Sequence, residues 1–498
     1  MSSPSPDLMS GSDVVGRRPD SRVPALVVLC TGMLMIVLDQ TIVNVALPTI
    51  RSDLGFSQAG LAWVVNAYLI AFGGLLLLAG RLGDLIGRKR VFLTGLTLFT
   101  AASLLCGVSA NQQMLVVARF IQGAGGALTS SVILGMIVTM FPEPREQAKA
   151  IGVYSFVASA GASIGLLLGG VLTQAINWHW IFFVNLPIAI TTAILAVRLV
   201  ESDRGIGLSE GADALGASLI TGSLMLGVYT IVGAIDHGWV SAHTLGLGGI
   251  AIALLVAFVL RQARTAKPLL PLRVFRSANV TGANAIVALM VAGMFGMFFL
   301  GALYLQQVLG YGALQVGLAF LPVATVIGAI QVGLAARLIG RFGARAVLLP
   351  GLSLIVVGLA LLTRTPVDGT YVTDLLPAMA LLGVGAGVSF PALMMLAMSD
   401  ATPSDSGLAS GLVNTTLQVG GALGLAVLAT LSASRTRNFL ADGRSSASAL
   451  TGGYHLAFAM GAVFVVVAIA IAAIVLRADT AAEPGFGVET SREREGVT

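Results

Sequence analysis

Long apolar segments recur along the whole chain and decide what it can fold into. Stretches such as Ile250–Leu260 carry no charge and do not alternate between polar and apolar side chains. A bilayer offers no hydrogen-bonding partner to a bare backbone, so such segments must fold as helices unless they close a barrel, whose strands would alternate. The segments therefore predict an all-α polytopic membrane protein.

The composition agrees with a chain whose main solvent is lipid. Of its 498 residues, 56% are hydrophobic and only 10% are charged, whereas soluble domains carry about 25% charged residues. The net charge of +5 is spread over short loops rather than gathered in one patch, which argues against nucleic acid as a partner. The two cysteines, Cys30 and Cys106, lie in apolar segments and predict no disulfide.

Fourteen apolar segments have the length of about 17 to 25 residues that a membrane-spanning helix needs. They are predicted to begin near residues 24, 60, 91, 113, 148, 180, 213, 243, 280, 314, 346, 373, 407 and 455. Polar tails flank them at 1–23 and 477–498. The first tail shows no short apolar core followed by a cleavage site, so we expect it to stay attached.

The positions of the basic residues predict on which side of the membrane each loop lies. Fourteen spans place both ends of the chain on one side, and cytoplasmic loops collect Lys and Arg. Of the 28 Lys and Arg residues, Arg119 falls inside a span, and the few in loops of the other side are Arg51, Arg364, Arg435, Arg437 and Arg444. We therefore expect both termini to be cytoplasmic, in what the Arg- and Ala-rich composition suggests is a bacterial inner membrane.

A sequence repeat divides the series of spans. Gly80–Arg90 reads GRLGDLIGRKR, and Gly333–Arg341, which begins 253 residues later, reads GLAARLIGR. This offset maps the second span onto the tenth. Many secondary transporters consist of two parallel halves, so the chain is predicted to have six spans in each half with two spans inserted between them.

The loop Gly80–Arg90 resembles the loop between helices two and three of the major facilitator superfamily. Within that superfamily the chain is similar to the fourteen-helix drug/proton antiporters of the multidrug efflux type. The residues that carry the match are Gly80, Gly83, Asp84, Gly87, Arg88 and Lys89. The resemblance implies that this loop is a cytoplasmic gating latch between the halves. It also implies the major facilitator fold, with halves at 24–200 and 278–476 and two linker helices within 201–277.

Asp39 is the carboxylate that falls deepest within a predicted span. The segment around it, Leu38–Pro48, reads LDQTIVNVALP and resembles the segment that marks the fourteen-helix group. An ionised acid at that depth costs several kcal/mol, so Asp39 should be protonated or paired. We expect a role in proton coupling, because a purely structural carboxylate would be a costly way to pack a helix.

Arg119 is the cation predicted to meet Asp39. Its segment, Arg119–Gly126, reads RFIQGAGG and resembles the basic motif of the superfamily. Asp39 lies nine residues before Pro48 and Arg119 lies eight residues after Asn111, which places both at about 12 to 14 Å from the same membrane face. Two roles remain open for Arg119, a structural clamp and a direct part in proton transfer.

Four glycines in the fifth span are predicted to form one stripe for close helix contact. They are Gly161, Gly165, Gly169 and Gly170, and their spacing resembles the antiporter motif of the family. The family pattern has a proline after the second glycine, where this chain has Leu166. That difference puts the proline-dependent bend in doubt and leaves another mode of coupling open.

Two smaller matches extend the resemblance over about residues 24–476. Trp178–Pro187 reads WHWIFFVNLP at the start of the sixth span, and Gly407–Asn414 opens the thirteenth. Aromatic residues beside Asn and Pro suit a membrane interface. His179 stands where relatives usually have arginine, and we expect it to be an exposed interface residue.

These features together predict a transporter driven by the proton gradient, without a bound metal or cofactor. Protonation of Asp39 would bias the exchange between two access states. No Gly-rich nucleotide-binding loop that ends in Lys-Ser/Thr occurs in the sequence. The expected partners are small organic substrates, protons and the bilayer, and a monomer suffices. Candidate residues for the substrate cavity are Met33, Asn44, Gln122, Phe295, Phe298, Tyr304 and Met394.

Several functions remain compatible with the sequence. The resemblance favours export of hydrophobic or amphipathic drugs, antibiotics and dyes. A dedicated exporter of one self-made metabolite and a proton symporter for uptake are alternatives. A membrane enzyme or sensor is a remote alternative, because the four histidines are scattered at 179, 237, 243 and 455 and form no cluster with carboxylates that would carry out chemistry.

Overall fold

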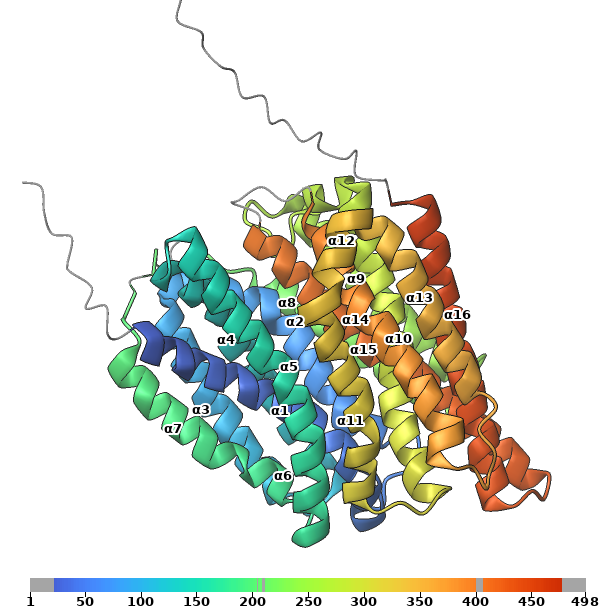
Figure 1. Ribbon diagram of the computed structural model, residues 1–498. Helices are drawn as coiled ribbons and strands as arrows, with labels where there is room; N and C mark the ends of the chain where they lie inside the picture. Colours follow the sequence, from blue (N-terminus) through green and yellow to red (C-terminus); the bar gives the residue numbers. More distant parts are fainter. Residues whose placement is uncertain (1–21, 204, 208–210, 400–405, 477–498) are drawn as a thin grey trace, which may run out of the picture.

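The computed structural model describes residues 22–203, 205–207, 211–399 and 406–476. Within these ranges every regular element is a helix, and the long helices stand side by side in one bundle (Figure 1). The predicted tails 1–23 and 477–498 lie outside the described residues, apart from Arg22 and Val23, which begin the first helix.

The helices follow the predicted order of spans. The first six spans are α1 (Arg22–Leu54), α2 (Ala62–Ile86), α3 (Arg88–Gly107), α4 (Gln112–Met140), α5 (Pro144–Ala175), and α6 (Trp180–Phe183) with α7 (Asn185–Leu199). Two more follow, α8 (Ala214–His237) and α9 (Ala242–Arg264). After the short turn η3 (Leu272–Arg276), the last six are α10 (Ala278–Gln307), α11 (Ala313–Ile330) with η4 (Gln331–Ala335) and α12 (Ala336–Phe342), α13 (Ala344–Leu362), η5 (Tyr371–Leu375) with α14 (Leu376–Met398), α15 (Ser406–Ala441) and α16 (Ser446–Ile474).

Each of the fourteen predicted spans falls on one of these helices. In the described part of the chain, 13 helices are long and apolar enough to cross a membrane. The remaining predicted span is α5, whose apolar stretch, Ala160–Ala175, is shorter. The last helix begins at Ser446 rather than near residue 455, because the Ser445 hydroxyl accepts a hydrogen bond from the Ser448 amide and caps a polar first turn.

The two sets of six spans share one packing pattern. In the first set α1 packs on α5 and α7, while α4 packs on α2 and α3. In the second set α10 packs on α15 and α16, while α14 packs on α11 and α13. Across the interface α2 contacts α15, α5 contacts α11, and α1 contacts α10. These paired contacts are those of two halves related by an axis along the bundle.

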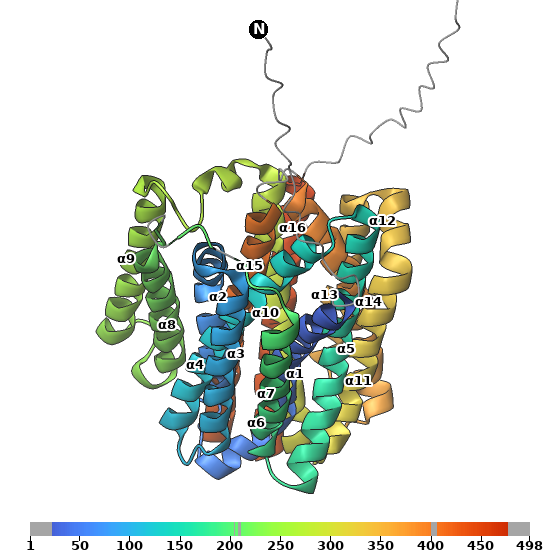
Figure 2. The same ribbon diagram turned by 90° about the vertical axis from the view of Figure 1, so that its left-hand side faces the viewer.

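The inserted helices α8 and α9 form a hairpin at one edge of the bundle (Figure 2). The α8 helix packs on both α2 and α15, and α9 lies outside it. Asp213 caps α8 by accepting a hydrogen bond from the Gly216 amide at 2.9 Å. Its carboxylate also accepts hydrogen bonds from the side chains of Arg261 and Gln262 of α9. Burial alone would raise the pKa of Asp213, but these hydrogen bonds outweigh it and hold that pKa below its ordinary value.

Hydrogen bonds join the two halves at the end of the bundle opposite to the Gly80–Arg90 loop. Gln306 Nε2 of α10 donates to the Val45 carbonyl of α1 at 2.9 Å, and Arg51 Nη1 donates to Gln307 Oε1 at 3.0 Å. Two further hydrogen bonds join the halves at this end. Gln58 Nε2 donates to the Ser432 hydroxyl, and the Leu314 amide donates to Gln174 Oε1. We call the four glutamines the glutamine closure: Gln58, Gln174, Gln306 and Gln307.

The sequence repeat holds for the helices but is displaced at the turn. Gly87 ends α2 with φ 100° and begins α3, a backbone conformation that favours glycine. Its structural counterpart in the second half is Gly343, with φ 82° between α12 and α13. The sequence offset pairs Gly87 with Gly340 instead. That pairing was wrong by three residues, and the π-helical segment η4 lies between α11 and this turn.

Candidate functional site

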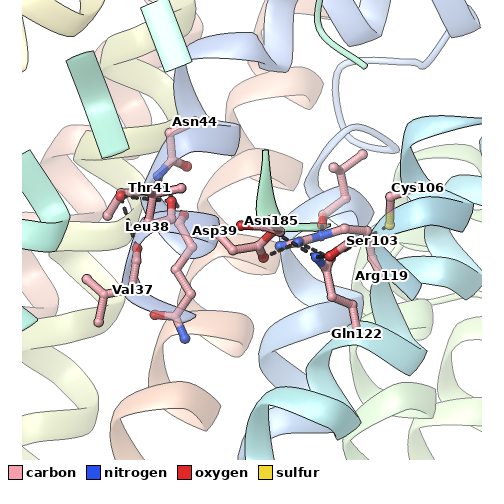
Figure 3. A network of polar contacts seen from close by, with 12 residues as sticks. Val37, Leu38, Asp39, Thr41, Asn44, Ser103, Cys106, Arg119, Gln122 and Asn185 are labelled. Carbon is pink, nitrogen blue, oxygen red and sulfur yellow. Dashed lines mark hydrogen bonds and ion pairs between the residues drawn. The ribbon is translucent and has the colours of Figure 1, made fainter. Parts of the chain in front are cut away.

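A buried polar cluster joins α1, α4 and α7 (Figure 3). Oδ2 of Asp39 accepts from Arg119 Nη1 at 2.6 Å. Oδ1 of the same carboxylate accepts from Gln122 Nε2 at 2.8 Å and from Asn185 Nδ2 at 2.9 Å. The Asp39 side chain is 0% exposed and that of Arg119 is 1% exposed. A carboxylate that accepts three hydrogen bonds has the partners of its ionised, acceptor-only form.

Arg119 makes three kinds of contact at once. Its Nε donates to the Val64 carbonyl at 2.9 Å, and its Nη1 also donates to Gln122 Oε1 at 2.6 Å. Its guanidinium carbon lies 4.4 Å from the centre of the Tyr68 ring, which adds a cation–π contact. The predicted meeting of Asp39 and Arg119 at equal depth is confirmed, and Arg119 also has the backbone contact expected of a clamp.

Glycines on α4 allow this cluster to form. A Cβ on Gly123 would collide with the Tyr68 backbone, and one on Gly126 would lie 2.8 Å from the Tyr68 hydroxyl. The close approach of α4 to α2 brings Arg119 over the Tyr68 ring. The missing side chains of these two glycines thus leave room for α2 against the face of α4 that carries Arg119.

Asn185 is the partner that can serve Asp39 in both protonation states. Its Nδ2 donates to the carboxylate, while its Oδ1 is buried without a hydrogen-bond partner among the described residues. Protonated Asp39 would carry a donor that needs an acceptor. A half-turn of the Asn185 amide would place its free oxygen there, so the cluster can lose the negative charge without leaving a buried hydroxyl unsatisfied.

A cavity of about 850 Å³ opens between the halves at the end that carries the Gly80–Arg90 loop. Its walls come from α1, α2, α4, α5, the segment before α10, and α15. The lining mixes apolar and aromatic side chains, such as Phe72 and Tyr154, with the amides of Gln40, Asn414 and Gln418. A volume and a lining of this kind suit a drug-sized amphipathic molecule.

The α1 helix carries the cavity and the buried cluster on different faces. Met33, Ile36, Val37 and Gln40 line the cavity, with the spacing of one helical face. Asp39, next to Gln40 in sequence, is fully buried on the other side. In this conformation a molecule in the cavity therefore contacts α1 without touching the carboxylate.

The residues predicted for the cavity are placed differently from one another. Met33 lines it. Gln122 and Tyr304 do not line it in this conformation, because they are buried with their polar groups bonded to Asp39 and to the Pro366 carbonyl. The other four do not line this cavity either; they are Asn44, Phe295, Phe298 and Met394. A single sequence does not specify helix rotation, so it cannot separate side chains of the cavity wall from those packed between helices.

The Gly80–Arg90 loop is held within its own half. Arg88 Nη1 donates to the Gly135 carbonyl at 3.0 Å and Nη2 contacts Asp84 at 3.4 Å, while Lys89 Nζ donates to the Val197 carbonyl at 2.9 Å. Hydrogen bonds between described residues do not link this loop to the second half. Since the cavity opens at this end, the predicted latch between the halves stays a prediction for the opposite conformation.

Asp203, which the sequence did not single out, fixes the start of α3. Its carboxylate accepts from the backbone amides of Arg88 at 2.8 Å and Lys89 at 3.2 Å. The neighbouring amides of Ile206 and Gly207 donate to the Asp84 and Leu85 carbonyls. The segment that leads to the inserted helices is thus tied to the Gly80–Arg90 loop, a long-range contact that no local sequence signal reveals.

The glycine stripe of α5 serves two contacts instead of one. Gly161, Gly165 and Gly169 face α1, where Cβ atoms would overlap side chains or backbone between Leu34 and Ile42. Gly170 faces Leu314 of α11 in the other half. Leu166, which replaces the family's proline, has its carbonyl against Gly317 of α11. The position of the missing proline therefore belongs to the interface between the halves.

The expectation that His179 is an exposed interface residue is wrong in part. Its ring lies 3.8 Å from that of Trp178, and the residue is only partly exposed. Burial lowers the pKa of His179, against the opposing influence of Asp53. Trp178 donates from Nε1 to Asp53 at 2.8 Å, so this motif joins the end of α1 to the start of α6.

Comparisons with known proteins agree with this geometry. Residues 29–425 match the family model of the Major Facilitator Superfamily. The puromycin resistance protein pur8 of Streptomyces alboniger is 40% identical over 92% of this chain and 93% of its own length. The cephamycin export protein CmcT of Amycolatopsis lactamdurans is 37% identical over 94% and 96%.

A solved structure shares the arrangement of helices at much lower sequence identity. It is the bacterial homolog of the human lysosomal transporter Spinster in an inward-facing, unoccupied conformation. The TM-score is 0.65 at 18% identity, with 92% of this chain and 97% of the other covered. This similarity concerns the fold alone.

Proposed function

The chain belongs to the major facilitator superfamily, and we propose that it exports small hydrophobic or amphipathic compounds, antibiotics among them, in exchange for protons. The relatives named above are a resistance protein and an export protein for antibiotics. The 850 Å³ cavity between the halves is lined by apolar, aromatic and amide side chains and by the charged Arg81, Asp84, Arg88 and Lys267. It supplies a binding site of suitable size and character for an amphipathic compound.

The observation that carries the proposal of proton coupling is the buried Asp39 cluster. The carboxylate lies 2.6 Å from Arg119, is closed to the cavity, and has an amide partner that fits both protonation states. A buried ionisable group in a membrane span is expensive and points to ion movement or proton relay. Its helix, α1, also lines the cavity, so a change in charge at Asp39 can be transmitted to the substrate.

The mechanism that these features support is alternating access. In the state described here the cavity is open at the Gly80–Arg90 end and the glutamine closure seals the other end. Protonation of Asp39 weakens its attraction for Arg119, while Arg119 keeps its bonds to Val64 and Gln122. The two halves can then rearrange about α1, α5 and α11, provided that the proton changes the relative free energy of the two states.

We place the Gly80–Arg90 end and both termini in the cytoplasm of a bacterial cell, with the glutamine closure outside, as the charge asymmetry predicts. A single copy contains both halves and the cavity, so a monomer suffices. Neither a metal nor an organic cofactor enters the proposed cycle, because the proton gradient supplies the work.

Breadth of specificity divides the proposal into two cases. Both relatives are named for a single antibiotic, which favours a dedicated exporter as a second candidate. Cells that lack their own efflux pumps, expressing this chain, would be challenged with puromycin, a cephamycin and unrelated dyes. Resistance to one chemical class supports the dedicated exporter, and resistance across classes supports a multidrug exporter.

Direction and coupling are tested in the same cells. We expect a labelled substrate to accumulate less when the chain is expressed, and a protonophore to abolish the difference. Accumulation that rises with expression and with an inward proton gradient would instead establish a symporter for uptake. If expression changes the accumulation of none of these compounds, although the protein is present in the membrane, transport of these compounds is contradicted. A membrane sensor or enzyme would then be the remaining alternative.

A further inference from the structure

Two arginines at the end of the bundle opposite to the Gly80–Arg90 loop have no role in the transport scheme. Cytoplasmic loops normally collect basic residues, so arginines at the predicted outer end call for an explanation. Arg51 bonds to Gln307 of the glutamine closure, and Arg437 pairs with Asp236 of α8 at 2.9 Å. Arg435 and Arg444, by contrast, form no salt bridge among the described residues.

Arg435 and Arg444 are both held against the same aromatic ring. Their guanidinium carbons lie 4.4 Å and 3.8 Å from the centre of the Phe439 ring. The ring itself is fixed, because Gly452 of α16 has no Cβ where one would overlap it. A guanidinium stacked on a ring keeps its N–H edge free for an anion. The two cations are therefore preorganised on the end of α15 and the turn that follows it.

These arginines line a second cavity, of about 530 Å³, between the ends of α13, α15 and α16. We call it the outer arginine pocket. The hydroxyl of Ser448 adds a further donor at its wall. His455 is held by its Nε2–H, which donates to the Thr365 carbonyl at 2.8 Å. Apolar groups complete the lining, among them Val367, Leu456 and Ala459.

An apolar surface continues from the pocket along the bundle. On α16, Val463 lies one turn beyond Ala459 and is 50% exposed. On α13, Val357 and Leu361 lie before the pocket residue Thr363 and are 48% and 37% exposed. The two helices pack on each other, and in a membrane these side chains would face lipid tails. The pocket thus combines cationic donors at the membrane surface with an apolar path below them.

From this combination we propose that the outer arginine pocket is a specific site for an anionic phospholipid. Arg435, Arg444 and Ser448 bind the phosphate group, and an acyl chain lies along the apolar surface of α13 and α16. Charge-assisted hydrogen bonds from guanidinium groups to phosphate are among the strong ones in proteins. The site is separate from the Asp39 cluster and from the cavity between the halves.

Binding would be measured on the purified full-length chain in a non-ionic detergent. Phosphatidylglycerol and phosphatidylcholine with identical chains would be titrated and the bound copies counted by native mass spectrometry. We expect one saturable phosphatidylglycerol site, and phosphatidylcholine binding weaker by about tenfold. Replacing both arginines, Arg435→Gln with Arg444→Gln, should lower the affinity for phosphatidylglycerol by tenfold or more. This is the loss expected when one or two charge-assisted hydrogen bonds are removed.

Arg437→Gln is the matched control, because Arg437 lies on the same turn of α15 but pairs with Asp236; it should leave lipid binding unchanged. If the double variant does not fold, Phe439→Leu, which keeps both charges and removes the ring that holds them, should also weaken binding. Equal affinity for both lipids, or unchanged affinity in the arginine variant, would overturn the proposal. So would full competition by inorganic phosphate, which would identify a site for the free anion.

Discussion

Asp39 is stable in its buried position because its three donors come from residues that are themselves held in place. Arg119 is fixed by the Val64 carbonyl and the Tyr68 ring, and Gln122 by Ser103 at 2.7 Å. Removing one partner of a buried ion pair typically costs about 3–5 kcal/mol, because the other charge is left uncompensated. The cluster therefore holds the carboxylate and the guanidinium together as a pair.

Asn185→Leu tests whether this residue adjusts to the protonation state of Asp39. The variant loses one hydrogen bond to a charged group, worth about 1.5–3 kcal/mol, and offers no acceptor to the protonated acid. Substrate-induced proton release from energised vesicles should slow by about tenfold or more, at equal protein level.

Asn66→Leu is the control for Asn185→Leu. Asn66 is also a buried asparagine, on α2, but both polar atoms of its side chain are without partners among the described residues. Vesicles with the Asn66→Leu variant should release protons at the wild-type rate when substrate is added. Equal losses in the two variants, or none in Asn185→Leu, would show that Asn185 only fills space.

At this scale the sequence predicted the pair but not its surroundings. Asp39 and Arg119 could be matched because depth follows from the helical rise and the distance to the helix ends. Asn185 was noticed only as part of an interface motif, since nothing in its own segment shows that it turns toward α1. Which side chains meet across three helices depends on helix rotation, which a single sequence does not specify.

Among the elements, the start of α3 depends on a residue far away in sequence. Gly87 provides no side chain to cap α3, and the carboxylate of Asp203 takes that part by accepting from the Arg88 and Lys89 amides. Negative charge at a helix N-terminus is favourable. The connection to α8 and α9 therefore stabilises the Gly80–Arg90 loop, which gives the inserted pair of helices a link to the region predicted to gate the cavity.

Asp203→Ala should loosen the start of α3. Loss of an N-terminal capping carboxylate costs about 0.5–2 kcal/mol. Hydrogen exchange of peptides that contain Arg88 and Lys89 should speed up by about two- to thirtyfold, with the rest of α3 less affected.

The matched variant for Asp203→Ala is Asp213→Ala, which removes the cap of α8. It should speed up exchange at the start of α8 and not at α3. Unchanged exchange at Arg88 and Lys89 in Asp203→Ala would mean that α3 begins there without help from the linker segment.

Element positions were largely readable from the sequence, because spans must be apolar over a fixed length. Errors fell where polar residues extend a helix, as at the start of α16, and where a local irregularity shifts the register. The turn at Gly87 lies seven residues after Gly80, whereas the turn at Gly343 lies ten residues after Gly333, so the repeat that aligns Gly80 with Gly333 does not align the two turns. Irregular turns of this kind leave no clear mark in composition or periodicity.

For the whole molecule, the balance between the two access states depends on weak bonds. The glutamine closure consists of hydrogen bonds from or to amide side chains, at 2.9 to 3.3 Å. Each bond between neutral groups is worth only about 0.5–1.5 kcal/mol net, and the bond from the charged Arg51 about 1.5–3 kcal/mol. The end closed by these glutamines can therefore open at modest cost, as the proposed alternating access requires. The organisation into six plus six spans followed from the sequence repeat. The end at which the cavity opens could not be predicted, because both access states satisfy the same apolar pattern.

Gln306→Leu should shift this balance toward the state that is open at the glutamine closure. The lost bond predicts a two- to tenfold change in the ratio of the two states. Spin labels at the exposed positions Ser52 and Asp368 would report the distance distribution across that end, with a larger share of long distances in the variant.

Gln315→Leu is the control for this change. Gln315 lies at the same end, but its Oε1 accepts from the Gly312 amide of its own segment, so the distances should stay as in wild type. An unaltered distribution in Gln306→Leu would show that the closure depends on packing rather than on the glutamine.

The central claim, that Asp39 couples export to proton movement, is tested most directly with inverted vesicles. Wild type and Asp39→Asn would be expressed at equal levels in a host without efflux pumps, and proton release would be followed when a substrate such as puromycin or ethidium is added. The account predicts substrate-induced proton release in wild type and none in Asp39→Asn, which keeps the size of the side chain and loses its charge. Transport and proton release at the wild-type rate in Asp39→Asn would contradict it.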